Sequence, residues 1–308
     1  MSSGKNHLAL RLSNLRKTYG EHLVLDGIEL EVEHGAIHGL VGLNGSGKTS
    51  TLDCILGLQR FDSGEVDVLG FSPDRLNRAC GRVVSVFDSP CLNPNLTVRQ
   101  TLTIGAMLCG AKTDSIKKFE ALLGIEQFST YKIRHLSLGN KRRTSIAQAL
   151  LGQPDLVLLD EPFNGLDAGG VDDVLELVKS LNENQGTTFL LSSHQLPYLE
   201  QICTHLSVLH QGKIAASNSV EELLKNRRAT AMIHSTNTQA AFEFLTQTSG
   251  IGEVRNERTG VISAELESLS SAELNRLLVE RHIPVDQLTL EKATLAGLFK
   301  QVTSGDAQ

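Results

Sequence analysis

Residues 42–49 have the composition and spacing of a phosphate-binding loop. They read Gly-Leu-Asn-Gly-Ser-Gly-Lys-Thr, fit the pattern GxxxxGK[ST], and lie between a predicted strand and a predicted helix. Glycines let backbone N–H groups converge on phosphate oxygens, and a helix N-terminus adds partial positive charge. Lys48 would reach the β- and γ-phosphates, and Thr49 would offer its hydroxyl to Mg²⁺. The residues predicted to bind nucleotide here are Gly42, Leu43, Asn44, Gly45, Ser46, Gly47, Lys48, Thr49 and Ser50.

Two adjacent carboxylates follow an apolar run at residues 156–159. A buried strand of a parallel sheet would deliver Asp160 and Glu161 at its carboxyl end, where α/β proteins bind ligands. We predict that Asp160 holds Mg²⁺ through water and that Glu161 polarises the attacking water as a general base. By itself, such a run is equally typical of a strand that ends in charged surface residues and has no catalytic role.

A third segment, residues 136–140, reads Leu-Ser-Leu-Gly-Asn and precedes a predicted helix at residues 142–151. A hydroxyl and backbone amides at a helix N-terminus bind anions, although Ser137 by itself is also typical of a plain N-cap. The segment resembles LSGGQ, the signature motif of the ABC ATPase family. The resemblance implies that Ser137, Gly139 and Asn140 contact ATP.

Other elements of this family occur in the same order between residue 8 and about residue 220. Tyr19 resembles the aromatic residue that stacks on adenine, Asp167 the aspartate of the communicating loop, and His194 the switch histidine that senses the γ-phosphate. Membership would make ATP and Mg²⁺ the cofactors. Glu161 and His194 would then be the catalytic residues.

Two positions depart from the family pattern. Asp88 stands where the family has a glutamine in the loop before its helical insert, and Leu138 replaces the first glycine of the signature. We predict that the Asp88 carboxylate joins the metal site, directly or through water. The alternative is that Asp88 points to solvent while Ser89 and Pro90 turn the chain.

The elements that must position these residues alternate between strands and helices. Short strands punctuated by Gly20, Gly27 and Gly35 come first, helical periodicity occupies about 94–151, and strands return at 155–159 and 187–191. This order predicts an α/β fold with a mainly parallel sheet covered on both faces. The resemblance specifies it as a phosphate-loop (RecA-like) ABC cassette over residues 8–225, with an antiparallel β subdomain and a helical insert.

Residues 226–308 are predicted to form a separate accessory domain. Strands at 230–234 and 284–290, helices at 239–248 and after 270, and two strands about residues 259–260 give the order βαββαβ of a small ferredoxin-like α+β unit. Ser270 and Glu273 have the spacing of a capping box. The segment offers no phosphate loop or metal cluster, which favours a regulatory or dimer-supporting role.

The bulk properties constrain the partners. The 308 residues carry a formal net charge of -6, which disfavours nucleic acid, and the five cysteines form no CxxC pair. Neither a secretory signal nor an apolar stretch of the ~20 residues needed to span a membrane is present. We therefore expect a cytoplasmic protein that reaches the inner face of the membrane through another chain.

The family architecture implies that two cassettes face each other, each completing the other's site. The cassette, its insert and the C-terminal domain together resemble subunits of the antibiotic-peptide and multidrug export type, which pair with a separately encoded transmembrane protein. Copper-enzyme maturation and polysaccharide systems use similar subunits, so the resemblance does not specify the substrate. Two alternatives remain at this point. One is a soluble ABC ATPase that acts on ribosomes or DNA, and the other is a regulatory subunit that binds ATP with little turnover.

Overall fold

The computed structural model describes residues 7–225, 229–258, 260–291 and 295–304. The chain divides into two compact units, one formed by Met1–Val220 with Val302–Gln308 and the other by Glu221–Gln301. The predicted boundary at about residue 226 lies outside the described residues.

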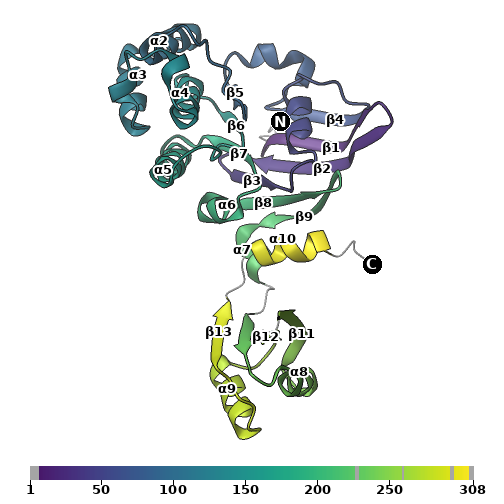
Figure 1. Ribbon diagram of the computed structural model, residues 1–308. Coiled ribbons are helices and arrows are strands. Elements are labelled where there is room, and N and C mark those ends of the chain that lie inside the picture. The colour runs from purple at the N-terminus through teal and green to yellow at the C-terminus, as the bar shows by residue number, and fades with distance from the viewer. Residues whose placement is uncertain (1–6, 226–228, 259, 292–294, 305–308) are drawn as a thin grey trace. The chain divides into compact units, whose positions relative to one another are not determined.

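A three-stranded antiparallel sheet opens the first unit. Its order is β2-β1-β4, with β1 at Leu8–Tyr19, β2 at His22–Glu33 and β4 at Ser63–Val68 (Figure 1). The expectation of short strands ending at glycines was wrong, because β1 and β2 have 12 residues each. Gly27 lies inside β2 with φ 75°, at a break in the β1–β2 register, so it forms a bulge rather than an end.

A six-stranded sheet, ordered β5-β6-β7-β3-β8-β9, forms the centre of this unit. Strands β5 to β8 run parallel to β3, and β9 is antiparallel to β8. All residues of β3, β6 and β7 are buried, as the continuous apolar runs predicted. The strands are β3 Ile37–Val41, β5 Val83–Val86, β6 Leu156–Asp160, β7 Thr188–Ser193, β8 His205–His210 and β9 Lys213–Ser219. The accompanying helices are α1 Lys48–Ile55, α5 Ala168–Gln185 and α6 Leu196–Ile202. Helix α7, Val220–Lys225, lies at the boundary between the two units.

Three helices between β5 and β6 pack on one another at one end of the unit (Figure 1). They are α2 Val98–Cys109, α3 Thr113–Leu122 and α4 Leu138–Leu150. The predicted start of α4 at residue 142 was wrong. Ser137 caps the helix by accepting a hydrogen bond from the Asn140 backbone N–H, so the helix begins four residues earlier and Gly139 lies in its first turn.

The second unit has its own core. Its elements are β10 Thr230–His234, α8 Thr238–Gln247, β11 Ile251–Arg258, β12 Val261–Leu266, α9 Ser271–Glu280 and β13 Gln287–Glu291. The sheet is antiparallel in the order β11-β12-β10-β13, and both helices share a buried cluster with it. Ser270 and Glu273 form a capping box at the start of α9. We keep the ferredoxin-like description as an interpretation of this topology. Helix α10 covers Leu295–Ser304, and no helix in the described ranges is long and apolar enough to cross a membrane.

Candidate active site

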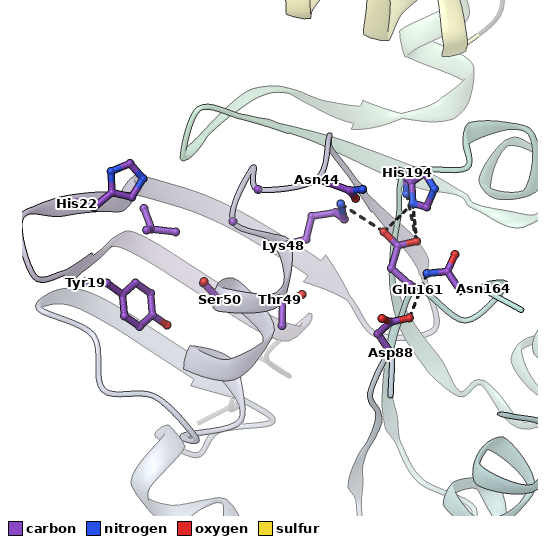
Figure 2. A pocket seen from close by; sticks show the side chains of 13 residues that line it. Tyr19, His22, Asn44, Lys48, Thr49, Ser50, Asp88, Glu161, Asn164 and His194 are labelled. Carbon is purple, nitrogen blue, oxygen red and sulfur yellow. Dashed lines mark hydrogen bonds and ion pairs between the residues drawn. The ribbon is translucent and has the colours of Figure 1, made fainter. Parts of the chain in front are cut away.

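A pocket of about 630 Å³ opens at the carboxyl ends of the central strands (Figure 2). The phosphate-binding loop and α1 form one wall, and residues from β1, β2 and the loops after β5, β6 and β7 complete it. The lining residues are Tyr19, His22, Val24, Asn44, Gly45, Gly47, Lys48, Thr49, Ser50, Asp88, Glu161, Asn164 and His194. Ten of them were predicted as site residues from the sequence, whereas His22, Val24 and Asn164 required the fold.

The loop between β3 and α1 is shaped by its glycines. Gly47 has φ 108°, and a Cβ there would lie 2.7 Å from Leu25 Cδ2, so this position admits no side chain. Ser46 is buried, and its Oγ has no hydrogen-bond partner among the described residues. A buried hydroxyl without a partner inside a phosphate-loop sequence indicates a group that expects a ligand.

Lys48 is buried, with only 6% of its side chain exposed. Its Nζ donates to Gly42 O at 2.8 Å and Leu43 O at 3.3 Å, and it lies 3.3 Å from Glu161 Oε1. Burying an ammonium requires such compensation. The charge is therefore held in place with a carboxylate as its counter-ion.

Glu161 adopts a left-handed backbone conformation, φ 47°, directly after β6. Its carboxylate accepts hydrogen bonds from Ser193 Oγ at 3.1 Å and from the His194 backbone N–H at 3.4 Å, and both its oxygens lie 3.0 Å from His194 Nδ1. An unusual φ at a pocket residue marks a conformation that surrounding contacts enforce. The two predicted catalytic residues therefore touch each other.

Asp160, next to Glu161, is buried as well. Its Oδ2 accepts from Thr49 Oγ1 at 3.0 Å and its Oδ1 accepts from Ser192 Oγ. Burial, together with the negative charge of Asp160, raises the pKa of nearby Asp53. A hydroxyl oxygen and a carboxylate oxygen that lie side by side are suitable ligands for a hard cation such as Mg²⁺.

Asp88 lines the pocket, but its carboxylate is engaged in a way that the sequence did not predict. Its Oδ1 lies 3.0 Å from Arg142 Nη2 and accepts from Asn164 Nδ2 at 3.1 Å. Asp88 is 56% exposed, so its side chain does face solvent, but its carboxylate is also paired. Arg142 follows the signature motif on α4. A basic residue at such a position is typical of a solvent-exposed helix face, so the neighbouring sequence could not have identified Asp88 as its partner.

Tyr19 lies at the open side of the pocket, 42% exposed, with Lys17 Nζ 4.7 Å from its ring centroid. The signature residues Ser137, Gly139 and Asn140 do not line this pocket. Neither does Asp167, which caps α5 through Gly170 N at 2.9 Å and pairs with Arg143 Nη2 at 3.2 Å. One chain thus brings together the phosphate loop, both carboxylates and the histidine, but not the signature.

Comparison with known proteins identifies families and relatives that match this chain. A model of the ABC transporter family matches residues 25–164, and a model described as an AAA domain, putative AbiEii toxin, matches residues 130–199. The chain is 30% identical to the bacitracin transport ATP-binding protein BcrA of Bacillus licheniformis over 299 residues, covering 96% of this chain and 97% of that protein.

Two further relatives cover the first unit. The Nod factor export ATP-binding protein I of Cupriavidus metallidurans is 36% identical over 220 residues, 70% of this chain and 72% of its own. The dimeric structure of an ATP-binding cassette in a post-hydrolysis state, bound to ADP and Pi, is 25% identical with a TM-score of 0.62, covering 68% of this chain and 98% of that one.

Proposed function

The chain belongs to the ABC transporter family of ATP-binding proteins, which hydrolyse ATP to drive transport, and we propose that Glu161 is its general base. The observation that carries this proposal is that the buried Glu161 carboxylate contacts both Lys48, at 3.3 Å, and His194, at 3.0 Å. The base is thereby fixed beside the group that would bind phosphate. His194 would hold the carboxylate and sense the γ-phosphate from the same position.

The Lys48–Glu161 ion pair suggests how substrate binding prepares the base. A nucleotide phosphate has a higher charge than one carboxylate and attracts the Lys48 ammonium more strongly. Lys48 would therefore turn toward the phosphates, and Glu161 would lose its counter-ion while Ser193 and His194 keep it oriented. A carboxylate released in this way accepts a proton from water more readily.

The donor pair of Thr49 and Asp160 fits Mg²⁺. No group of three or more His, Cys, Asp or Glu side chains suited to a metal occurs in the described part of the chain, which agrees with a cation held largely by waters and nucleotide phosphates. Bound there, Mg²⁺ would neutralise charge on the phosphates. Because Arg142 and Asn164 share Asp88 Oδ1, we place Asp88 at the edge of this site, acting through water.

The separation of Ser137, Gly139 and Asn140 from the pocket supports a dimer of cassettes. Each of these residues lies at the N-terminus of α4, where backbone N–H groups favour an anion. In a facing pair of chains, the signature of one would close the pocket of the other over the γ-phosphate. The dimeric relative bound to ADP and Pi is consistent with this arrangement.

We further propose that the chain drives export through a separately encoded transmembrane protein and lies at the cytoplasmic face of the membrane. The names of two relatives, a bacitracin transport protein and a Nod factor export protein, support this proposal. Residues 8–225 would be the motor and residues 226–308 an accessory domain.

The test is Glu161→Gln, which keeps the shape of the side chain but removes its basicity. ATP turnover should fall at least ~100-fold, while binding of a fluorescent ATP analogue stays unchanged. With ATP and Mg²⁺ the variant should elute from a sizing column as a persistent dimer.

Glu183→Gln is the matched control, because Glu183 lies exposed on α5, where it pairs with Lys179 on the same helix, and it does not line the pocket. It should behave as the wild type does. Undiminished turnover by Glu161→Gln would exclude the general-base role, and a monomer at every ATP concentration would exclude the closed pair.

A further inference from the structure

Arg142 is the largest fully buried side chain described in this protein, and it carries a charge. Its Nη1 donates to Phe87 O at 3.4 Å and Asp160 O at 3.3 Å, and its Nη2 contacts both the carbonyl and the carboxylate of Asp88. Nε has no partner in the described residues. One guanidinium therefore ties three segments together: helix α4, the loop after β5, and the end of strand β6.

The contacts continue from Asp88 across the pocket. Asn164 Nδ2 donates to Asp88 Oδ1 at 3.1 Å, and Asn164 Oδ1 accepts from Gln195 Nε2 at 3.0 Å (Figure 2 shows the first of these). We call Arg142, Asp88, Asn164 and Gln195 the polar chain. Its far end adjoins His194, and Gln195 N binds Ser193 Oγ, which in turn donates to Glu161.

The polar chain links two parts of the ATPase that are far apart in sequence. At one end, the signature residue Ser137 is the N-cap of α4. At the other end are the residues that orient Glu161. A displacement of α4 must either move Asp88 with it or separate the two charges, of which Arg142 is buried and Asp88 is 56% exposed. Separation would leave the buried guanidinium without its carboxylate, which is unfavourable.

We propose that Arg142 is a positioning residue of the ATPase, which through Asp88 and Asn164 makes the orientation of Glu161 and His194 depend on the position of the signature helix. This rests on the proposed function, since it assumes that Glu161 is the base. Arg142 touches no reacting atom. Substitution of Arg142 should therefore lower turnover and leave nucleotide affinity unchanged.

The experiment compares Arg142→Gln, Asp88→Gln and the double variant with the full-length wild type, measuring kcat, KM for ATP, nucleotide affinity and melting temperature. Arg142→Gln should lower kcat about tenfold or more with KM within about twofold. The double variant should have a kcat at least about threefold higher than that of Arg142→Gln. The two amides can hydrogen-bond to each other, and neither leaves a charge unpaired.

Arg99→Gln is the matched control. Arg99 pairs with the fully buried Glu120 inside the same group of helices but does not touch the polar chain. It should lower the melting temperature and leave kcat unchanged. If Arg142→Gln does not fold, Arg142→Lys decides in its place, because an ammonium cannot bridge Asp88 and the β6 carbonyl together.

Several outcomes would overturn the proposal. They are wild-type kcat in the Arg142 variant, an equal loss of kcat in Arg99→Gln, or a double variant no more active than Arg142→Gln. Failure of the proposed function looks different, because Glu161→Gln would then hydrolyse ATP as fast as the wild type does.

Discussion

Two charges of opposite sign meet on the floor of the pocket, in the buried pair of Lys48 and Glu161. Burying either charged side chain without the other would cost a large amount of folding free energy. Each partner therefore keeps the other charged and in place until a phosphate competes for Lys48.

Lys48→Ala should weaken ATP binding at least about tenfold, because one charge-assisted contact to phosphate is lost, and should reduce turnover to background. Titration of a fluorescent ATP analogue and a phosphate-release assay measure the two effects. Lys179→Ala is the control, since Lys179 is exposed on α5 and 4.0 Å from Glu183. Normal turnover by Lys48→Ala would exclude the phosphate-loop assignment.

At the scale of elements, strand β3 carries a buried histidine just before the phosphate loop. His38 Nε2 lies 2.8 Å from Ser207 Oγ, and its ring stacks on His205 with centroids 6.0 Å apart. Burial, with a smaller contribution from His205, lowers the pKa of His38 from 6.5 to about 3. The folded protein therefore keeps His38 neutral where the unfolded chain would bind a proton.

This difference predicts acid destabilisation. The contribution of neutral His38 to the free energy of unfolding is complete above pH 6.5 and is lost as the pH falls toward 3. Between pH 7.5 and 5.5 the wild type should lose about 1.4 kcal/mol more than His38→Gln. Urea unfolding at both pH values measures it, and parallel losses in the two proteins would contradict the prediction.

The loop after β6 packs directly on the start of α4. Gly165 has φ 75°, and a Cβ there would lie 2.9 Å from Leu138 Cδ2, so the leucine that departs from the family signature fits against this glycine. Gly165→Ala should cost about 1–2 kcal/mol of stability from the left-handed backbone and should also push Leu138 aside, lowering ATPase activity.

Adding Leu138→Ala to Gly165→Ala should recover activity but not stability, because it relieves the contact and leaves the backbone strain. Thermal unfolding and turnover separate the two effects. An activity that stays low in the double variant would show that the contact does not position α4.

At the scale of the whole molecule, the two units have separate cores. The first is centred on residues such as Leu10, Leu40 and Leu158, and the second on Ala231, Ile262 and Leu274. Every residue of the pocket belongs to the first unit. A chain ended after Lys225 should therefore bind ATP within about fivefold of the full-length affinity, given that ~1 kcal/mol is the usual scale of indirect effects.

A sizing column with ATP tests the second unit's role on the same truncated protein. If that unit supports the dimer, truncation of the Glu161→Gln variant should weaken the ATP-dependent dimer and spare monomer binding. Loss of nucleotide affinity in a soluble, folded truncation would show that the boundary is misplaced.

The amino-acid sequence by itself determined the family, the phosphate loop, the adjacent carboxylates and the strands that carry them. These features are local: Gly42 to Thr49 form one loop, and a five-residue buried strand such as β6 differs from its surroundings in composition alone. Only the tertiary structure decided that Glu161 pairs with Lys48 and His194, and that Arg142 holds Asp88, 54 residues away in sequence. The physical reason is that burial and counter-charge depend on which segments the sheet order brings together, and no window of sequence contains both partners.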